Sequence, residues 1–570
     1  MTGTDPNTDL CLSSLEARPS KASMTEMQYA ESITDNGHEI STHRTACTSG
    51  SGSGGSKLQF WIDRKVTLAF FPLCLLTLMV ALEAASLSIA LPVVTEELRG
   101  SAIEAFWSGT SFVLCSACCQ LIFTSLSTAF GRQLLIVVAV IFFLVGTIVS
   151  GVATNFTEML VGRSIQGTGG GGIIALSEVS VTDMIPFRLR GAYWGVLGSM
   201  WSIGSVIGPI MGGGFSTNSD WRWIFYINVP FAALCIPLIL IYLKIKTKRT
   251  TRREKLRNFD TVGLVLFVCS TASFLIALSW GGVMYAWHSW RVLVPLIIGT
   301  FGIIGVMVYE THIPTDPILQ VSGIDNHSLL ISYIGTVLQG LTLWCILYYL
   351  PLYAEAVHGF RPLPAGVAAL PLAFAIAPSA CASGIIAVLS GRYRILIWIG
   401  WAVATLGFGI LCYFDRTTKG AIWISLIAIP GLGLGGLVTS IAYAIQACSE
   451  TRHLATATAL FSFFRAFGQS LGVAIGGVIF QNRMEVNLQK YPALAPMAKK
   501  ISHNAVALVG KMQTEPPSQD KDDLRQAYTD SLRAVWVFCC ACTAIGGLLS
   551  LLTKEYSIDQ NHDTDQGLEE

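Results

Sequence analysis

Long apolar segments separated by short polar stretches occupy the chain from about residue 66 to residue 552. An α-helix needs about 20 apolar residues to cross a bilayer. Backbone groups in lipid must find hydrogen-bond partners within the protein, which favours helices over open strands. Fourteen segments are long enough, at residues 66–91, 104–127, 133–153, 157–180, 190–213, 223–243, 260–281, 289–309, 328–351, 363–389, 394–413, 420–442, 456–480 and 531–552. The sequence therefore predicts an all-α membrane protein with 14 transmembrane helices.

The composition agrees with a membrane protein and argues against a soluble, a nucleic-acid-binding or a metal-binding protein. Only 13% of the 570 residues are charged and 52% are hydrophobic, whereas soluble domains carry about 25% charged residues. A net charge of +1 does not indicate nucleic-acid binding. Cys115 and Cys118 form a C-x-x-C motif, but no second cysteine pair or histidine lies near them in the sequence. We therefore expect no metal site and no cofactor.

The first 65 residues are polar and rich in Ser, Thr and Gly, which predicts a disordered cytosolic tail. Within this tail, Ser49–Lys57 resembles a phosphate-binding loop only superficially. Ser56 rather than Gly precedes Lys57, and Leu58 rather than Ser or Thr follows it. We therefore do not expect a nucleotide-driven pump.

Lys and Arg residues are concentrated in loops on one predicted side of the membrane, above all in the stretch 244–257. Because cytosolic loops are enriched in Lys and Arg, we expect this side to be cytosolic and to carry both chain ends, including the tail 553–570. The polar stretch 482–530 falls on the outer side as a long loop, for which the charge rule is weak. A glycosylation sequon that begins at Asn155 also falls on the outer side, but it abuts the membrane and we expect it to remain unused.

Small residues recur at fixed intervals in the predicted fifth helix. Close contact between helices in lipid depends on small residues that let the backbones approach. Gly204, Gly208 and Gly212 share one helix face because they are four residues apart, and Pro209 bends the helix there or allows it to bend. The full set is Gly195, Gly204, Gly208, Pro209, Gly212 and Gly213. From its spacing alone, this set is equally compatible with ordinary helix packing.

The order of these residues resembles the antiporter motif in the fifth helix of the major facilitator superfamily. Trp221–Pro230 is similar to the segment that follows this motif in the fourteen-span drug:proton antiporter branch of that family. The resemblance covers about residues 66–552. It implies a major facilitator fold with two six-helix bundles, at 66–243 and 328–552. The region 244–327 between them would hold a basic cytosolic loop and two linking helices.

Three ionisable residues stand out within the predicted spans, namely Glu83, Arg163 and Arg465. A charge in lipid costs about 2.5–3.5 kcal/mol, so each of them requires a reason. The first span runs outward and the fourth runs inward, which places Glu83 and Arg163 roughly 12 Å and 9 Å below the outer ends of their helices. Gln166 follows Arg163 on the same helix face. The depths of Glu83 and Arg163 therefore allow an acid–base pair, to either member of which Gln166 could form a hydrogen bond.

Two interpretations of this pair remain open. The pair can neutralise two buried charges and set the helix packing, or Glu83 can exchange a proton under the influence of Arg163. Arg163, Gln166 and Gly167 resemble the fourth-helix motif of the family, and the resemblance implies a role in proton coupling. Arg465 and the glycines that follow it resemble the thirteenth-helix pattern of the branch. For Arg465 a structural and a functional role are both open.

The loop between the second and third spans departs from the family pattern. Gly131 and Arg132 match it, but Thr128 stands where the family has an Asp, and Gln133 stands where it has a second basic residue. In the family that Asp helps to latch the cytosolic gate. We therefore expect the latch to be weaker in this chain or to be built from other residues.

The resemblance implies proton-coupled efflux of small, largely apolar compounds such as secondary metabolites, toxins or drugs, bound near the membrane midplane between the bundles. The partners would be a small-molecule substrate, protons and the lipid bilayer. We expect a monomer in the plasma membrane, with the vacuolar membrane as the alternative. The rival functions are proton-driven uptake, of a siderophore or of vacuolar basic amino acids, and a non-transporting receptor. The spans show no cluster of His, Asp or Cys at one membrane face, so we do not expect an enzyme.

Overall fold

The computed structural model describes residues 64–100, 102–245, 260–282, 284–312, 326–450, 453–503, 505–514 and 516–556. Almost all of the predicted N-terminal tail, most of the basic stretch 244–257 and most of the tail 553–570 lie outside these residues. Within them the regular secondary structure is helical, and one isolated β-bridge joins Gly281 and Tyr285.

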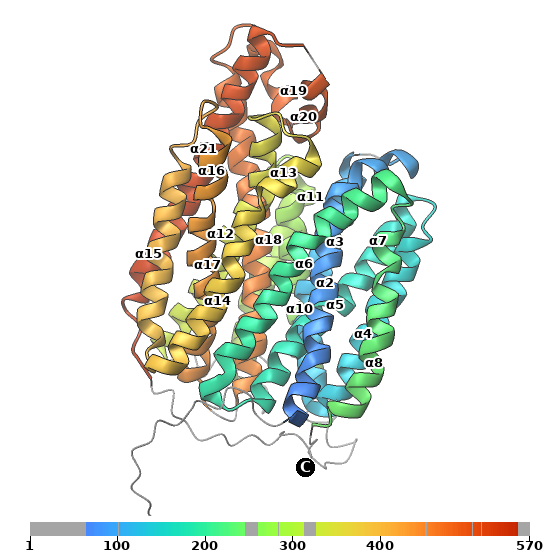
Figure 1. Ribbon diagram of the computed structural model, residues 1–570, viewed down its shortest axis with the longest axis vertical. Coiled ribbons are helices and arrows are strands. Elements are labelled where there is room, and N and C mark those ends of the chain that lie inside the picture. Colours follow the sequence, from blue (N-terminus) through green and yellow to red (C-terminus); the bar gives the residue numbers. More distant parts are fainter. Residues whose placement is uncertain are drawn as a thin grey trace, which may run out of the picture. The chain divides into compact units, whose positions relative to one another are not determined.

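The first six predicted spans form one group of helices, drawn from blue to green in Figure 1. They are α2 (Arg64–Glu97), α3 (Ala102–Phe130), α4 (Arg132–Gly151), α5 (Phe156–Met184), α6 (Arg190–Asn218), and the pair α7 (Trp223–Tyr226) and α8 (Asn228–Tyr242). Helix α2 packs along α6, and α5 packs against both α3 and α4. We call this group the N-terminal bundle.

The last six predicted spans form a second group, the C-terminal bundle. It contains α12 (His327–Ala356), α13 (Pro362–Ala368), α14 (Leu370–Ser390), α15 (Tyr393–Leu411), α16 (Gly420–Leu426), α17 (Ala428–Cys448), α18 (Leu454–Leu488) and α21 (Gln519–Ser550). Helix α12 packs against α18, and α17 packs against both α14 and α15. The two bundles meet chiefly where α6 lies along α14.

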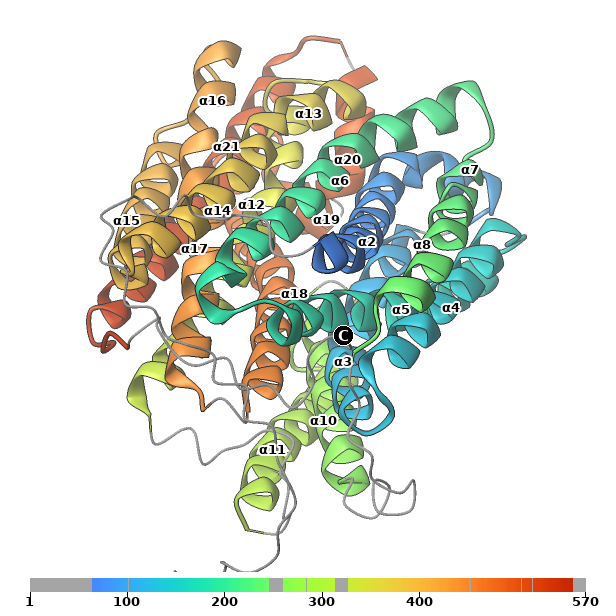
Figure 2. The same ribbon diagram turned by 60° about the horizontal axis from the view of Figure 1, so that its bottom comes forward.

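Two helices link the bundles, α10 (Thr261–Trp280) and α11 (Trp290–His312). They pack against each other, and α10 also contacts α3 of the first bundle and α18 of the second (Figure 2). Of the two linking helices, α10 therefore touches both halves of the protein.

Thirteen helical segments of the described chain, with split pairs counted once, are long and apolar enough to span a membrane. The remaining predicted span is α5, which is 29 residues long but carries Glu158, Arg163, Glu178 and Asp183 besides a run of glycines. Composition rather than length sets α5 apart, and it is packed against α3 and α4 like its neighbours. The structure is therefore consistent with the predicted 14 spans.

Three predicted spans are each interrupted at a single residue, a detail that the sequence did not predict. The interruptions lie at Ile227, Ala369 and Ile427, and each is followed within three residues by a proline, Pro230, Pro371 or Pro430 respectively. Proline has no N–H group to donate to the carbonyl four residues earlier. The helical hydrogen bonding is therefore weakened at these points.

The predicted outer loop 482–530 is largely helical, a feature that the sequence did not predict. Helix α18 continues to Leu488 and α21 begins at Gln519, with α19 (Ala498–His503) and α20 (Ala505–Thr514) between them. Val509 and Met512 of α20 are buried, and Gln513 Nε2 donates to the carbonyl oxygen of Phe360 at 2.8 Å. The stretch is polar overall but amphipathic locally, and its apolar side chains pack on the end of the C-terminal bundle.

A charged cluster holds the end of α2 against the start of α7. Arg222 Nη1 and Trp221 Nε1 each donate to a carboxylate oxygen of Glu97 at 2.7 Å. The hydrogen bond from Arg222, and then that from Trp221, hold the pKa of Glu97 below its usual value.

This cluster predicts a local pH dependence. Because a lowered pKa favours the ionised carboxylate, the stabilisation is complete above the unfolded-state pKa of about 4.3 and is lost as the pH falls through the folded-state pKa. We expect amide hydrogen exchange at Trp223–Tyr226, corrected for its intrinsic rate, to accelerate below about pH 4. In Glu97→Gln it should be fast at every pH, and equal protection in the two proteins would contradict this role.

Candidate functional site

Glu83 of α2 and Arg163 of α5 meet inside the N-terminal bundle. Arg163 Nη1 lies 2.8 Å from Glu83 Oε1, and each residue is only 1% exposed. The second carboxylate oxygen of Glu83 accepts a hydrogen bond from Asn228 Nδ2 of α8 at 2.6 Å. The carboxylate is thus held by a cation on one side and by an amide donor on the other.

Further contacts hold the Arg163 guanidinium. Its Nε donates to the carbonyl oxygen of Ser108 in α3 at 3.0 Å, and its Nη1 donates to Gln166 Oε1 at 2.7 Å. Gln166 Nε2 in turn donates to Thr147 Oγ1 of α4 at 2.8 Å. The guanidinium carbon also lies 4.5 Å from the centre of the Phe112 ring. Helices α2, α3, α4, α5 and α8 therefore converge on a single acid–base cluster.

The two buried charges of the cluster depend on each other. Burying two charges is costly, and their mutual attraction offsets this cost only with good geometry and additional hydrogen bonds. A proton added to Glu83 would leave the Arg163 charge without its partner in a site that excludes water.

Sequence reasoning missed Asn228 as a member of this cluster. It lies within the segment Trp221–Pro230 that carries the family resemblance, but it bears no charge and therefore did not stand out among the ionisable residues of the spans. Its position at the first residue of α8 and its complete burial are the signals that the structure adds.

The glycine face of α6 contacts the stretch of α2 that carries Glu83. A Cβ atom added to Gly204 would lie 2.5 Å from Ala81 Cβ, and one added to Gly208 would lie 2.7 Å from Ala85 Cβ. A Cβ atom on Gly212 would lie 2.1 Å from the carbonyl oxygen of Ser86. Only glycine allows α6 to approach α2 this closely. The glycine face of α6 and Glu83 therefore lie at the same contact between two helices.

The other members of the predicted motif lie along the same helix. Gly195 faces the C-terminal bundle, where a Cβ atom would lie 2.8 Å from Cys381 Cα of α14. Pro209 lies inside α6, next to Gly208. Gly213 is buried, and its carbonyl oxygen accepts a hydrogen bond from Ser216 Oγ at 3.2 Å. Helix α6 therefore packs closely against both α2 and α14 through small residues.

Arg465 of α18 pairs with a carboxylate across the two bundles. Its Nη2 contacts Glu178 Oε1 of α5, and Ser462 Oγ donates to the other oxygen of the same carboxylate. Four residues further along α5, Thr182 Oγ1 lies 3.2 Å from Thr458 Oγ1 of α18. Among the described residues, the Glu178–Arg465 contact is the one ion pair that joins the bundles. Glu178 lies near the end of the predicted fourth span, 157–180, and was not among the residues that the sequence analysis singled out.

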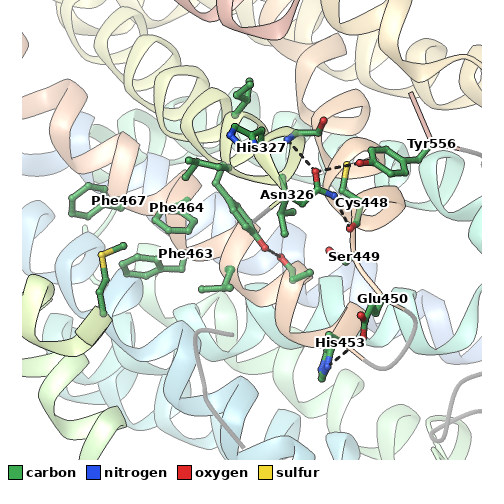
Figure 3. A pocket seen from close by; sticks show the side chains of 18 of the residues that line it. Asn326, His327, Cys448, Ser449, Glu450, His453, Phe463, Phe464, Phe467 and Tyr556 are labelled. Carbon is green, nitrogen blue, oxygen red and sulfur yellow. Dashed lines mark hydrogen bonds and ion pairs between the residues drawn. The ribbon is translucent and has the colours of Figure 1, made fainter. Parts of the chain in front are cut away.

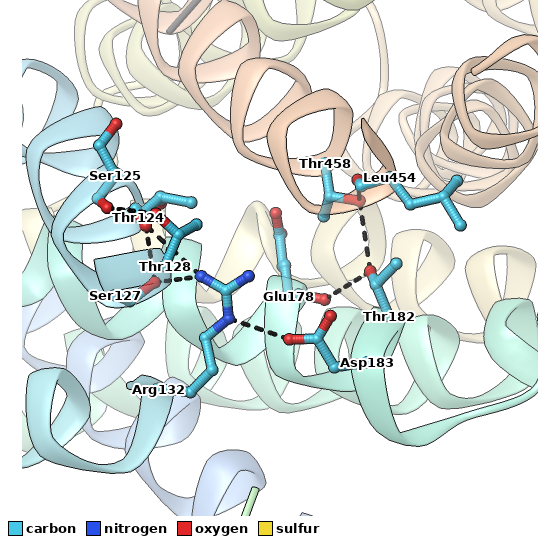
Figure 4. A network of polar contacts seen from close by, with 10 residues as sticks. All are labelled: Thr124, Ser125, Ser127, Thr128, Arg132, Glu178, Thr182, Asp183, Leu454 and Thr458. Atoms are coloured by element: carbon cyan, nitrogen blue, oxygen red, sulfur yellow. Dashed lines mark hydrogen bonds and ion pairs between the residues drawn. The ribbon is translucent and has the colours of Figure 1, made fainter. Parts of the chain in front are cut away.

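Arg132 of the predicted loop between the second and third spans is held by an acidic residue of α5. Its Nε lies 2.9 Å from Asp183 Oδ2 of α5, and its Nη1 contacts Ser127 Oγ (Figure 4). Thr128, which stands in place of the family's Asp, donates to the carbonyl oxygen of Ser125. Gly131 adopts φ 98°, a conformation that favours glycine and positions Arg132 at the start of α4.

Polar contacts also join the bundles where α6 begins. Arg190 Nη1 donates to Gln446 Oε1 of α17 at 3.0 Å, and the Gly191 amide donates to the Tyr443 hydroxyl at 2.7 Å. Together with the Glu178 and Thr182 contacts, they hold the two bundles together at the predicted cytosolic end.

Asn155 lies at the opposite end of α5, where it caps the helix. Its Oδ1 accepts a hydrogen bond from the Glu158 amide at 3.0 Å, and its side chain is exposed. A capping role accounts for this residue without a glycan.

Residues 73–473 match the sequence model of the Major Facilitator Superfamily, which is well over half of the chain. The chain belongs to the major facilitator superfamily. This membership accords with the helical fold of the described residues.

Curated members of the superfamily from fungi resemble the chain over most of its length. A protein of Phoma sp. named MFS transporter L2 is 46% identical over 88% of this chain and 84% of its own. An acurin A biosynthesis cluster MFS-type transporter of Aspergillus aculeatus is 34% identical over 90% of this chain and 92% of its own. The MFS-type efflux pump LUC4 of a Fusarium species is 33% identical over 90% of each chain.

A solved structure shares the fold. The human organic anion transporter MFSD10 superposes with a TM-score of 0.51 and covers 86% of this chain and 100% of its own, at 12% identity. At this identity the comparison supports the major facilitator fold alone.

Proposed function

We propose that this major facilitator protein is a proton-coupled exporter of small, largely apolar compounds such as secondary metabolites, toxins or drugs. The observation that carries the proposal is the contact between the glycine face of α6 and the stretch of α2 that holds Glu83. It joins a buried carboxylate, which can take up a proton, to a close contact between two helices that has no side chains on the α6 side. The relatives named as efflux pumps and as a biosynthesis-cluster transporter support the direction and the substrate class.

The cluster suggests how a proton would drive the cycle. With Glu83 ionised, Arg163 and Asn228 hold α2, α5 and α8 together. When Glu83 takes up a proton, Arg163 must find another partner, and α2 shifts against α6 along the glycine face. Because α6 also packs on α14 of the other bundle, this shift is transmitted to the contact between the bundles. The substrate site between them would then open alternately to either side.

The energy available is sufficient for export. One proton that moves inward through 100 mV releases about 2.3 kcal/mol, and each unit of pH difference adds about 1.4 kcal/mol. Both terms together sustain a concentration ratio of roughly 500-fold for a neutral solute. On the same proposal the protein acts as a monomer in the plasma membrane, with both chain ends in the cytosol and without enzymatic activity.

Reconstituted vesicles test the proposal. Purified full-length protein is inserted into liposomes, and the movement of a panel of neutral fungal metabolites and dyes is followed with and without an imposed proton gradient. Export requires that at least one compound moves against its gradient only while protons flow in the opposite direction. Movement in the same direction as protons would instead establish uptake, and binding without movement would establish a receptor.

The ion pair between the bundles provides a separate prediction. The Glu178 and Arg465 side chains are only 12% and 15% exposed, and removing one partner of a buried pair costs about 3–5 kcal/mol. We therefore expect Glu178→Gln to shift the protein away from the state in which the predicted cytosolic end is closed.

Cross-linking measures this shift. Thr182→Cys and Thr458→Cys place two thiols where hydroxyl oxygens lie 3.2 Å apart, and mass spectrometry quantifies the disulfide after oxidation. The yield should fall severalfold with Glu178→Gln and recover in part with the exchanged pair Glu178→Arg and Arg465→Glu. An unchanged yield with Glu178→Gln would show that the pair does not hold the bundles closed.

A further inference from the structure

A large cavity lies apart from the Glu83 cluster, between the linking helices and the C-terminal bundle. It has a volume of about 1140 Å³ and is lined by α10, α11, α12, α18, the segment between α17 and α18, and residues that follow α21 (Figure 3). No described residue of the N-terminal bundle lines it. It is therefore distinct from a substrate site between the two bundles.

The cavity has an aromatic end and a polar end. Phe463, Phe464 and Phe467 of α18 lie at one end, while Asn326, Ser449 and His453 lie at the other (Figure 3). The aromatic end is extended by Tyr333, whose ring centre lies 5.0 Å from that of Phe464. Cavities that bind small organic molecules combine such an apolar lining with a few polar groups.

The polar end carries charges of both signs. Glu450 Oε2 lies 3.8 Å from His453 Nε2. Lys554, which also lines the cavity, lies beside Ser328, because its backbone amide donates to Ser328 Oγ at 2.9 Å. Because acidic and basic side chains occur together at this end, the polar end does not select a ligand with a net negative or net positive charge. A neutral head group on the bound molecule is therefore favoured.

An unpaired hydroxyl points to a bound molecule. Thr271 of α10 lines the cavity and is 1% exposed, and its hydroxyl has no hydrogen-bond partner among the described residues. Leaving such a group unpaired is costly. A ligand with an oxygen acceptor next to its aromatic part would satisfy it.

Apolar side chains border the cavity on the surface that faces lipid. Met307 of α11 is 44% exposed and Leu330 of α12 is 40% exposed, and both line the cavity. A compound dissolved in the adjoining leaflet could reach the phenylalanines by this route without crossing the polar end.

From these observations we infer that the cavity is a loading site for a neutral amphipathic aromatic compound, reached from the predicted cytosolic leaflet. The aromatic part packs on Phe463, Phe464 and Phe467, an acceptor oxygen takes the Thr271 hydroxyl, and the polar head lies toward His453. Phe463 and Phe467 lie on the face of α18 opposite Ser462 and Arg465, because the helix turns by about 100° per residue. A bound molecule thus contacts the helix that carries the ion pair between the bundles. The inference rests on the proposed export function for its physiological meaning.

Photolabelling of the full-length protein in nanodiscs tests this site. The probe is 4-(hydroxymethyl)benzophenone, which is neutral, carries two aryl rings, a carbonyl acceptor and a hydroxyl head, and reacts with nearby C–H bonds on irradiation. We expect saturable labelling on peptides that contain residues 329–333 or 460–467. Labelling that is spread over the lipid-facing helices and does not saturate would show that lipid fills the cavity, and would overturn the inference.

Two variants with matched controls sharpen the test. Met307→Trp narrows the cavity from its exposed edge and should reduce labelling of both peptides at least fivefold, whereas Val308→Trp, also exposed to lipid but outside the lining, should not. Thr271→Val should raise the half-saturating probe concentration about three- to tenfold. Thr300→Val, whose hydroxyl is paired within α11, should leave it unchanged. Equal labelling in Met307→Trp and Val308→Trp would also overturn the inference.

This readout does not depend on transport. A protein that binds the probe in the cavity but moves no compound in vesicles would contradict the proposed function and leave the binding site standing. A protein that exports compounds but is labelled elsewhere would contradict the loading site alone.

Discussion

Glu83→Gln is expected to reduce proton-coupled efflux to the level of empty vesicles while the protein still reaches the membrane. The carboxylate is the group in the acid–base cluster that can exchange a proton, and glutamine keeps its shape without that ability. Efflux of a transported compound should be followed as a function of pH in vesicles, with the amount of inserted protein measured in parallel. Glu97→Gln, which alters an exposed carboxylate on the same helix, is the control and should retain transport.

A double variant separates the two interpretations of the acid–base pair. If Glu83 and Arg163 only neutralise each other, then removing both charges with Glu83→Gln and Arg163→Gln should restore a stable and pH-dependent transporter. If Glu83 carries the proton, the double variant should be as stable as the wild type or nearly so, but remain inactive. Normal pH-dependent efflux by either variant would remove Glu83 from the mechanism.

Gly208→Leu is expected to lower the transport rate by at least tenfold. The Cβ atom alone would lie 2.7 Å from Ala85 Cβ and 3.0 Å from the Leu82 carbonyl oxygen, so the remaining leucine atoms have no room. Overpacking of this kind costs about 1–3 kcal/mol, and α6 would be forced away from the stretch of α2 that holds Glu83. The initial rate of efflux and the thermal unfolding temperature should both fall.

Gly214→Leu provides the matched control on the same helix. A Cβ atom at this position meets no described atom within 4 Å, so transport and stability should be close to those of the wild type. If Gly208→Leu transported as well as Gly214→Leu, the glycine face would have no part in the conformational change.

The fold could be predicted to a large extent because lipid imposes few solutions on an apolar chain. The length of the apolar segments and the need to pair every backbone group leave helices that cross the membrane, whatever the details of packing. Helix α5 shows the limit of this argument, since its charges and glycines make it the least apolar of the predicted spans. The stretch 482–530 shows a second limit of this argument. Its short helices could be recognised only from the tertiary structure, in which Val509 and Met512 of α20 are buried.

The candidate site could be predicted where burial in lipid made a residue conspicuous. Glu83 and Arg163 stand out as charges within spans, and their depths can be compared because the rise per helical residue is constant. Asn228 carries no charge, and Glu178 and Asp183 lie near the end of a span where charges are ordinary. None of these three had a pattern in the sequence that distinguished it from its neighbours.

The sequence by itself therefore determined the class of protein, the approximate position of each span and the acidic and basic residues that lipid would force to pair. Only the tertiary structure decided that Asp183 pairs with Arg132, that Glu178 joins Arg465 across the bundles, and that the glycine face of α6 meets the stretch of α2 around Glu83. Depth along a helix follows from residue number, but the direction in which a side chain points depends on how that helix is rotated against its neighbours. That rotation is set by the packing of helices that lie far apart in the chain, and no local pattern encodes it.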